Sequence, residues 1–99
     1  MSVRIVENWS DLVARVQDIH LAEDLDGFEA LELYVEESFE VEGYPNLLAQ
    51  SIDTSIVVYF PAEVVKTLEI SPGRVVSCRV RRADLIRNFV HREFIHMQY

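Results

Sequence analysis

The segment from Leu31 to Glu42 alternates between apolar and polar residues, and this pattern restricts the chain to a sheet-forming fold. The odd positions are apolar apart from Glu37, and the even positions are mostly acidic. A period of two places successive side chains on opposite faces of a strand. We therefore expect one long half-buried strand, or two strands separated by a β-bulge at Glu37. Its polar face would carry a glutamate row consisting of Glu32, Glu36, Glu40 and Glu42.

The segment SIVVYFPAEVVKTLEISPGRVVSCRVRR, residues 55–82, indicates a strand, a short helix, a turn and a second strand. Pro61 has the backbone angle required at a first helical position, and Glu63 would lie in the first turn, where the helix dipole favours a negative charge. This predicts a helix over residues 61–68. Pro72 and Gly73 suit the two central positions of a type II turn. We expect a shared set of buried side chains here: Val64, Leu68, Ile70, Val76 and Val80.

The remaining segments give weaker patterns. Residues 9–24 have apolar side chains at helical spacing and favour a helix, although the same residues also fit the first strand of a barrel. Residues 2–6 fit a short strand, and residues 88–99 fit a last strand with Phe89, Ile95 and Met97 on one side.

The order of strand, short helix, L-E-I-S-P-G and strand resembles the second half of oligonucleotide/oligosaccharide-binding (OB) barrels, in which a helix lies between the third and fourth strands. The phrase P-A-E-V-V-K-T-L-E-I-S-P-G-R-V-V is also similar to the swapped-hairpin barrels of AbrB-type transcription factors. The resemblance covers residues 55–82. Together with the strand patterns it implies a mainly β (α+β) domain over residues 1–99: a small OB-like barrel of about five strands with one or two short helices.

Composition and motifs exclude several classes of protein. The chain has 99 residues and one cysteine, Cys78, which cannot form an internal disulfide. No apolar run approaches the roughly 18 residues that span a bilayer, and the first residues do not resemble a secretory signal. We therefore expect a cytoplasmic protein without a membrane partner. No nucleophile, phosphate-loop or zinc-protease motif is present, so we expect neither an enzyme nor a cofactor. His91, Glu93 and His96 do not complete a metal-ligand set.

Charge is distributed unevenly along the chain, whose net charge is −8. Residues 1–65 contain two basic and fourteen acidic residues, whereas residues 66–99 contain seven basic and three acidic ones. The basic part contains an arginine set that could contact a polyanion or a second copy of the chain: Arg79, Arg81, Arg82, Arg87 and Arg92. Neutralisation by neighbouring acidic strands is the simpler interpretation.

Two functions fit these features. The first is a non-catalytic protein–protein interaction or assembly subunit, in which the glutamate row contacts a basic partner or the arginine set of a second copy. A homodimer would also cover an exposed sheet edge. The alternative is a domain that binds single-stranded nucleic acid, with the arginine set along the backbone and bases stacked on Tyr34, Tyr59 and Phe94. Because the glutamates would repel phosphate, we favour protein interaction.

Overall fold

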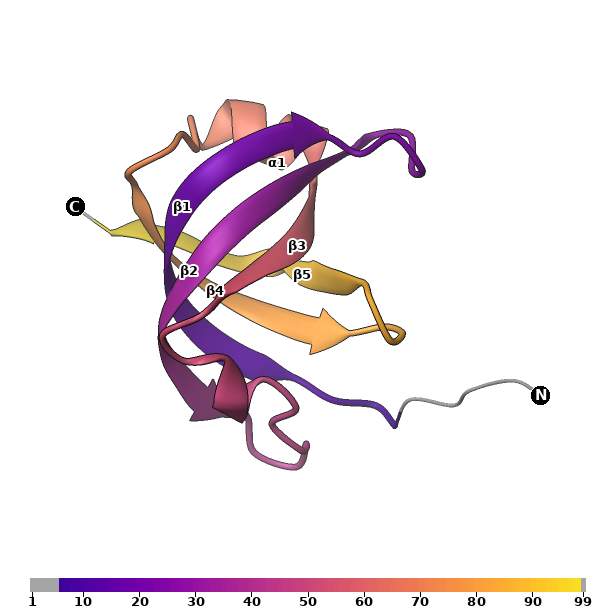
Figure 1. Ribbon diagram of the computed structural model, residues 1–99, viewed down its shortest axis with the longest axis vertical. Helices are drawn as coiled ribbons and strands as arrows, with labels where there is room; N and C mark the ends of the chain where they lie inside the picture. The colour runs from indigo at the N-terminus through magenta and orange to yellow at the C-terminus, as the bar shows by residue number, and fades with distance from the viewer. Residues whose placement is uncertain (1–5, 99) are drawn as a thin grey trace.

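The computed structural model describes residues 6–98 and contains five strands and one short α-helix (Figure 1). The strands are β1 (Ser10–Leu21), β2 (Phe28–Glu40), β3 (Ser55–Pro61), β4 (Val75–Arg82) and β5 (Asn88–Gln98). The helix α1 (Ala62–Thr67) connects β3 to β4, and a 3₁₀ turn (Ala49–Ser51) precedes β3. The mainly β fold class is therefore confirmed. The strand predicted at residues 2–6 lies, except for Val6, outside the described residues.

The sheet closes on itself in the order β1-β2-β3-β5-β4, and β4 pairs with β1. All neighbours are antiparallel except β3 and β5, which share a short parallel contact through Val58–Asn88 and Tyr59–Phe89. No strand is therefore unpaired along its whole length on one side, but β5 beyond Phe89 has β4 as its only hydrogen-bonded neighbour, so an open sheet edge is confined to that part of the barrel.

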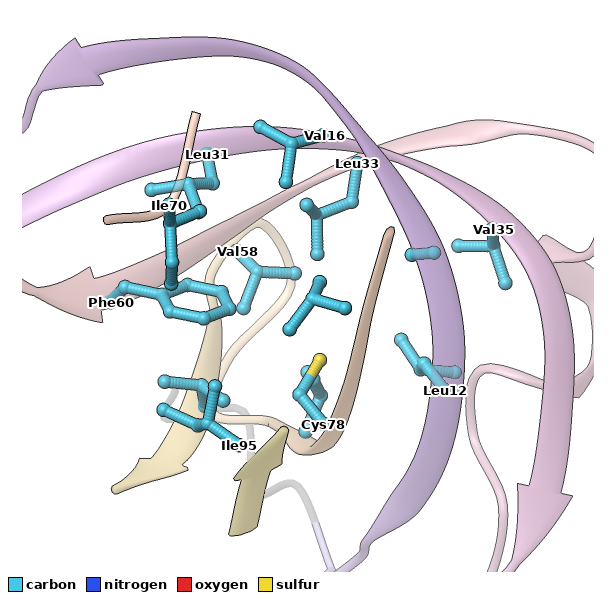
Figure 2. Packing of buried hydrophobic residues seen from close by; sticks show 14 of the residues in the cluster. Leu12, Val16, Leu31, Leu33, Val35, Val58, Phe60, Ile70, Cys78 and Ile95 are labelled. Atoms are coloured by element: carbon cyan, nitrogen blue, oxygen red, sulfur yellow. The ribbon is translucent and has the colours of Figure 1, made fainter. Parts of the chain in front are cut away.

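One face of each strand points into the barrel and forms the core. Figure 2 shows side chains from several strands meeting there, among them Leu33 and Phe60, both fully buried. Leu31, Leu33 and Val35 of β2 occupy alternate positions and are all 0% exposed, as the period-two pattern predicts. Burial of these apolar surfaces is the main stabilising contribution to the fold.

The segment from residue 55 to 82 forms the predicted strand, short helix, turn and strand, but Pro61 ends β3 and is the N-cap of α1, so the prediction that it is the first helical residue is wrong. Ile70, Val76 and Val80 are buried in the core, and Val64 and Leu68 are partly buried against it. The turn after α1 is closed by a hydrogen bond of 3.2 Å from the backbone N–H of Arg74 to the carbonyl of Ser71. Gly73 has a φ of 92°, a conformation that glycine adopts without steric cost.

The helix favoured for residues 9–24 is wrong, because this segment forms strand β1. Leu12, Ala14 and Val16 alternate into the core, and Val13 points outward between them. A bulge then shifts the alternation. Val16 pairs with Leu33 and Asp18 with Glu32, so Gln17 is an extra residue and Ile19 packs against the core. The apolar spacing that suggests a helix is thus produced by a bulged strand.

A bulge also interrupts β2, as one of the two sequence interpretations predicted, but one residue before the predicted position of Glu37. Val13 pairs with Glu37 and Ala14 with Val35, which leaves Glu36 as the extra residue. The bulge reverses the inward and outward positions of the residues that follow it. The sequence alternation placed Phe39 on the apolar face with Leu31, Leu33 and Val35. Because of the bulge, Phe39 instead lies on the outer face and is 52% exposed.

The third irregularity is in β5. Val90 pairs with Val80 and Ile95 pairs with Cys78, so residues 91–94 of β5 lie opposite the single residue Arg79. Ile95 and Met97 pack into or against the core, as predicted. Phe89 precedes this excursion and points outward beside Tyr59, so the prediction that it shares their side is wrong.

Candidate protein-interaction surface

The outer surface of β2, β3 and β5 brings together several residues identified from the sequence. We call it the β2–β3–β5 face and define it by Phe28, Glu32, Tyr34, Val57, Tyr59 and Phe89. Cross-strand pairs place Tyr59 between Ala30 and Phe89, and Val57 beside Glu32. These residues point outward because Leu31, Leu33, Val58 and Phe60, their neighbours along the strands, point into the core.

Three aromatic rings form a cluster on this face. The centroid of the Phe89 ring lies 5.3 Å from that of Tyr59 and 5.8 Å from that of Phe28, both in edge-on geometry. The Arg81 guanidinium lies 6.0 Å from the Phe89 ring centroid. Val57 is 45% exposed beside them. The cluster therefore presents apolar surface to solvent within a framework of packed rings.

Carboxylates border the aromatic cluster. The Tyr59 hydroxyl donates to Asp24 at 3.3 Å, and the Tyr34 hydroxyl donates to Asp53 at 3.3 Å. The pKa of both tyrosines is raised, first by desolvation and then by the nearby carboxylate. Both phenols therefore remain neutral hydrogen-bond donors at physiological pH, and the face has a negative border.

Loop 83–87, between β4 and β5, is closed by the carboxylate of Asp84. Its Oδ1 accepts hydrogen bonds from the backbone N–H groups of Ile86 at 2.9 Å and Arg87 at 2.7 Å, and its Oδ2 accepts from Arg87 Nε at 2.8 Å. These bonds stabilise the ionised carboxylate and lower the pKa of Asp84. The loop is therefore a structured turn.

This structured loop exposes two large apolar side chains at its tip. Leu85 is 67% exposed and Ile86 is 83% exposed. Arg87 Nη1 also lies 3.7 Å from Asp24 in loop 22–27, and this ion pair connects the loop to the border of the β2–β3–β5 face. Adjacent exposed apolar residues beside a partly exposed aromatic cluster are typical of an interaction surface.

The predicted glutamate row does not form a continuous row. Glu32 lies on the β2–β3–β5 face, next to Asp18 of β1. Glu36 is the bulge residue and pairs with Arg15 at 3.5 Å. Glu40 ends β2 opposite Ser10, and Glu42 lies beyond the strand in the following turn. The bulge and the end of the strand separate residues that the alternation placed together.

The arginine set is also dispersed over the molecule. Arg79 bonds to Asp11 through Nε at 2.8 Å and Nη2 at 3.2 Å, and Arg92, in the β5 excursion, pairs with Glu63 of α1. Arg87 bonds to Asp84 and Asp24.

The two other members of the set have different surroundings. Arg81 lies against the aromatic cluster, and Arg82 is at the end of β4, where its backbone bonds to the side chain of Asn8. The set therefore does not share one face, and three of its five members bond to carboxylates of their own chain.

The three proposed stacking residues divide between two surfaces. Tyr34 and Tyr59 belong to the β2–β3–β5 face, whereas Phe94 lies under the Arg79 guanidinium, whose carbon is 4.1 Å from the ring centroid. Sequence reasoning did not identify Phe89 or the Leu85–Ile86 tip. The tetrapeptide D-L-I-R, residues 84–87, contained a usable signal, because an aspartate at the start of a short loop often closes a turn onto the backbone.

Other kinds of site receive less support from the described residues. Within residues 6–98, no three His, Cys, Asp or Glu side chains gather in a group that could hold a metal ion. Cys78 is buried, and desolvation raises its pKa to about 12, which keeps the thiol protonated. The helices in this part of the chain include none long and apolar enough to cross a membrane.

No protein-family model matches the chain, and no curated protein matches its sequence.

Proposed function

We propose that this chain is a non-catalytic protein-interaction module that binds its partner through the β2–β3–β5 face and loop 83–87. The observation that carries the proposal is the exposure of Leu85 and Ile86 on a turn that Asp84 holds closed. These side chains contribute little to the core, and the turn holds them in solvent beside the aromatic cluster. Such an arrangement suits insertion into an apolar pocket of another protein.

We further propose that the barrel is of the OB type, which the sequence resemblance suggested. The strand order β1-β2-β3-β5-β4, the helix between β3 and β4 and the parallel β3–β5 contact support this assignment. OB-type barrels bind ligands on the face of their second and third strands and through the loops that follow strands one and four. By this analogy the surface lies where the aromatic cluster and loop 83–87 lie.

The charges around the face indicate the chemistry of the partner. Asp24, Asp53 and Glu32 border the aromatic cluster, and the chain as a whole carries a net charge of −8. A partner segment with apolar side chains flanked by lysine or arginine would complement this surface, and the attraction would mainly accelerate association and orient it. We propose the cytoplasm as the compartment, where the single free thiol remains reduced.

Single-stranded nucleic acid is the second candidate ligand, favoured by the proximity of Arg81 to Phe89 and Tyr59. Stacking rings with a neighbouring guanidinium are typical of such sites. The carboxylates of Asp24 and Glu32 oppose this function because they repel phosphate. Arg87, the other arginine near the face, already bonds to Asp84 and Asp24.

The proposal is tested by comparing the wild type with a Leu85→Ser/Ile86→Ser double variant, both immobilised and exposed to an extract of the source cells. The matched control is Leu47→Ser, which removes an exposed leucine from the loop between β2 and β3. A captured protein is then purified and titrated calorimetrically. We expect equal affinity for the wild type and the control, and affinity at least about tenfold lower for the double variant, as for loss of one hot spot. Equal affinity for all three proteins would contradict the proposal.

A further inference from the structure

A second surface, on the opposite side of β2 from β3, has a self-complementary pattern of side chains. It is formed by the outer faces of β2, β1, β4 and β5, and we call it the β2–β1–β4–β5 face. Cross-strand pairing arranges it in two rows. The first row contains Phe39, Asp11, Arg79 and Phe94, in the strand order β2-β1-β4-β5. The second row contains Glu37, Val13, Ser77 and His96 in the same order.

The ends of the first row are apolar and exposed. Phe39 is 52% exposed, and Phe94 is 39% exposed because the β5 excursion brings its ring onto the outer face under Arg79. Between them lies an open groove of about 340 Å³ whose lining includes Ser77 and His96. Bulges that direct a side chain outward in this way often occur at functional positions.

The centre of the first row is an ion pair between neighbouring strands. Asp11 accepts two hydrogen bonds from Arg79, and these bonds raise the pKa of the Arg79 guanidinium. The bonds use Nε and Nη2 of Arg79, and a guanidinium has five N–H donors in total. Arg79 therefore keeps further N–H groups that can donate to a second carboxylate.

We propose that this face is a docking site for a second copy of the chain, with a two-fold axis parallel to the strands between β1 and β4. Such an axis places β2 of one copy over β5 of the other, and β1 over β4. Phe39 then faces Phe94 of the second copy and Asp11 faces its Arg79. In the second row, Glu37 faces His96.

Each of these contacts joins groups that attract, which is the evidence for a second copy as the occupant. The aromatic ends of the row meet each other, and each carboxylate meets a basic side chain. Because a two-fold axis repeats every contact, each of these pairs of side chains occurs twice in the dimer. Eight side chains per copy are fewer than the roughly 20–30 residues per partner of a standard interface. Association should therefore be weak and dependent on concentration.

This dimer differs from the one expected from the sequence. That expectation placed the glutamate row against the arginine set, and neither exists as one surface. The geometry instead uses Asp11, Glu37 and His96, none of which belongs to those sets. It is also independent of the β2–β3–β5 face, so the two proposals can fail separately.

The test uses two charge variants at exposed positions, Glu37→Lys and His96→Glu. In a homodimer of the first variant, the introduced lysine would face His96. In a homodimer of the second, Glu37 would face the introduced glutamate. In the mixed dimer, the introduced lysine of one copy faces the introduced glutamate of the other, and the remaining contact is the native pair. Sedimentation velocity up to about 0.5 mM measures each association. Glu23→Lys, in loop 22–27, is the control with the same change of net charge as Glu37→Lys.

We expect the wild type and Glu23→Lys to self-associate, each of the two variants alone to associate more than about tenfold more weakly, and their equimolar mixture to recover wild-type association. Recovery in the mixture supports the proposed two-fold geometry. A wild type that is monomeric at all concentrations would overturn the proposal. So would unchanged self-association of both variants, or a mixture no tighter than the variants alone.

Discussion

The exposed tip of loop 83–87 leads to a prediction about stability that distinguishes an interaction surface from a part of the core. The perturbation is the double substitution Leu85→Ser/Ile86→Ser. From their exposures of 67% and 83%, the two residues together bury about half of one side chain. Full burial of one such side chain contributes about 1.5–3 kcal/mol, so the double variant should lose about 1 kcal/mol of the free energy of unfolding.

A matched core variant gives the contrasting result. Leu33 is 0% exposed, and Leu33→Ala should reduce the free energy of unfolding by about 2–5 kcal/mol. Urea denaturation followed by circular dichroism measures both values from the transition midpoint and its slope. A loss above about 2 kcal/mol for the double variant would show that the tip supports the fold, and would refute its assignment as a surface available to a partner.

Three further outcomes are expected. The pKa of Asp84 is lowered, first by the backbone hydrogen bond from Ile86 and then by the Arg87 side chain, so these bonds stabilise the loop fully above the unfolded pKa of about 3.9. The Ile86 amide resonance should therefore change only as the pH falls below that value and through the lower folded pKa. A change that is complete at higher pH would contradict this prediction. Cys78, with a pKa of about 12, should resist disulfide reagents at neutral pH until urea unfolds the protein, so rapid native labelling would be inconsistent with its burial. Leu68→Ala should cost about 2 kcal/mol, the low end of the range for core leucines, because Leu68 is only partly buried; a value near zero in urea denaturation would place it outside the core.

Local patterns were sufficient to predict much of the fold. The alternation from Leu31 to Val35 and the turn at Gly73 depend on neighbouring residues, and the structure confirms both. The bulge in β2 was readable because a glutamate interrupted the alternation.

Bulges in the other strands could not be read in this way. The extra residue of the β1 bulge, Gln17, does not interrupt a run of alternating apolar residues, so the sequence does not reveal this bulge. The segment that forms β1 was therefore interpreted as a helix. The excursion at residues 91–94 depends on how β5 pairs with β4, and the residues next to the excursion in the sequence do not determine this pairing. The excursion brings Phe94 onto the outer face.

The candidate site depended even more on long-range contacts. Asp11 and Arg79 are 68 residues apart, and their bond becomes possible only when β1 and β4 close the barrel. Sequence charge counts could therefore suggest that acidic and basic segments neutralise each other, but not which residues pair. Tyr34 and Tyr59 were named from the sequence as stacking residues, whereas their carboxylate partners come from loops with no periodic pattern.

The measurement that most directly tests protein interaction against nucleic-acid binding is fluorescence anisotropy with a labelled single-stranded oligonucleotide at physiological salt. The account predicts a Kd no tighter than the roughly 10⁻⁴–10⁻⁶ M of non-specific contact, with little change in Arg81→Glu. Submicromolar binding that is lost in Arg81→Glu would contradict the account, and would identify the aromatic cluster as a base-stacking surface.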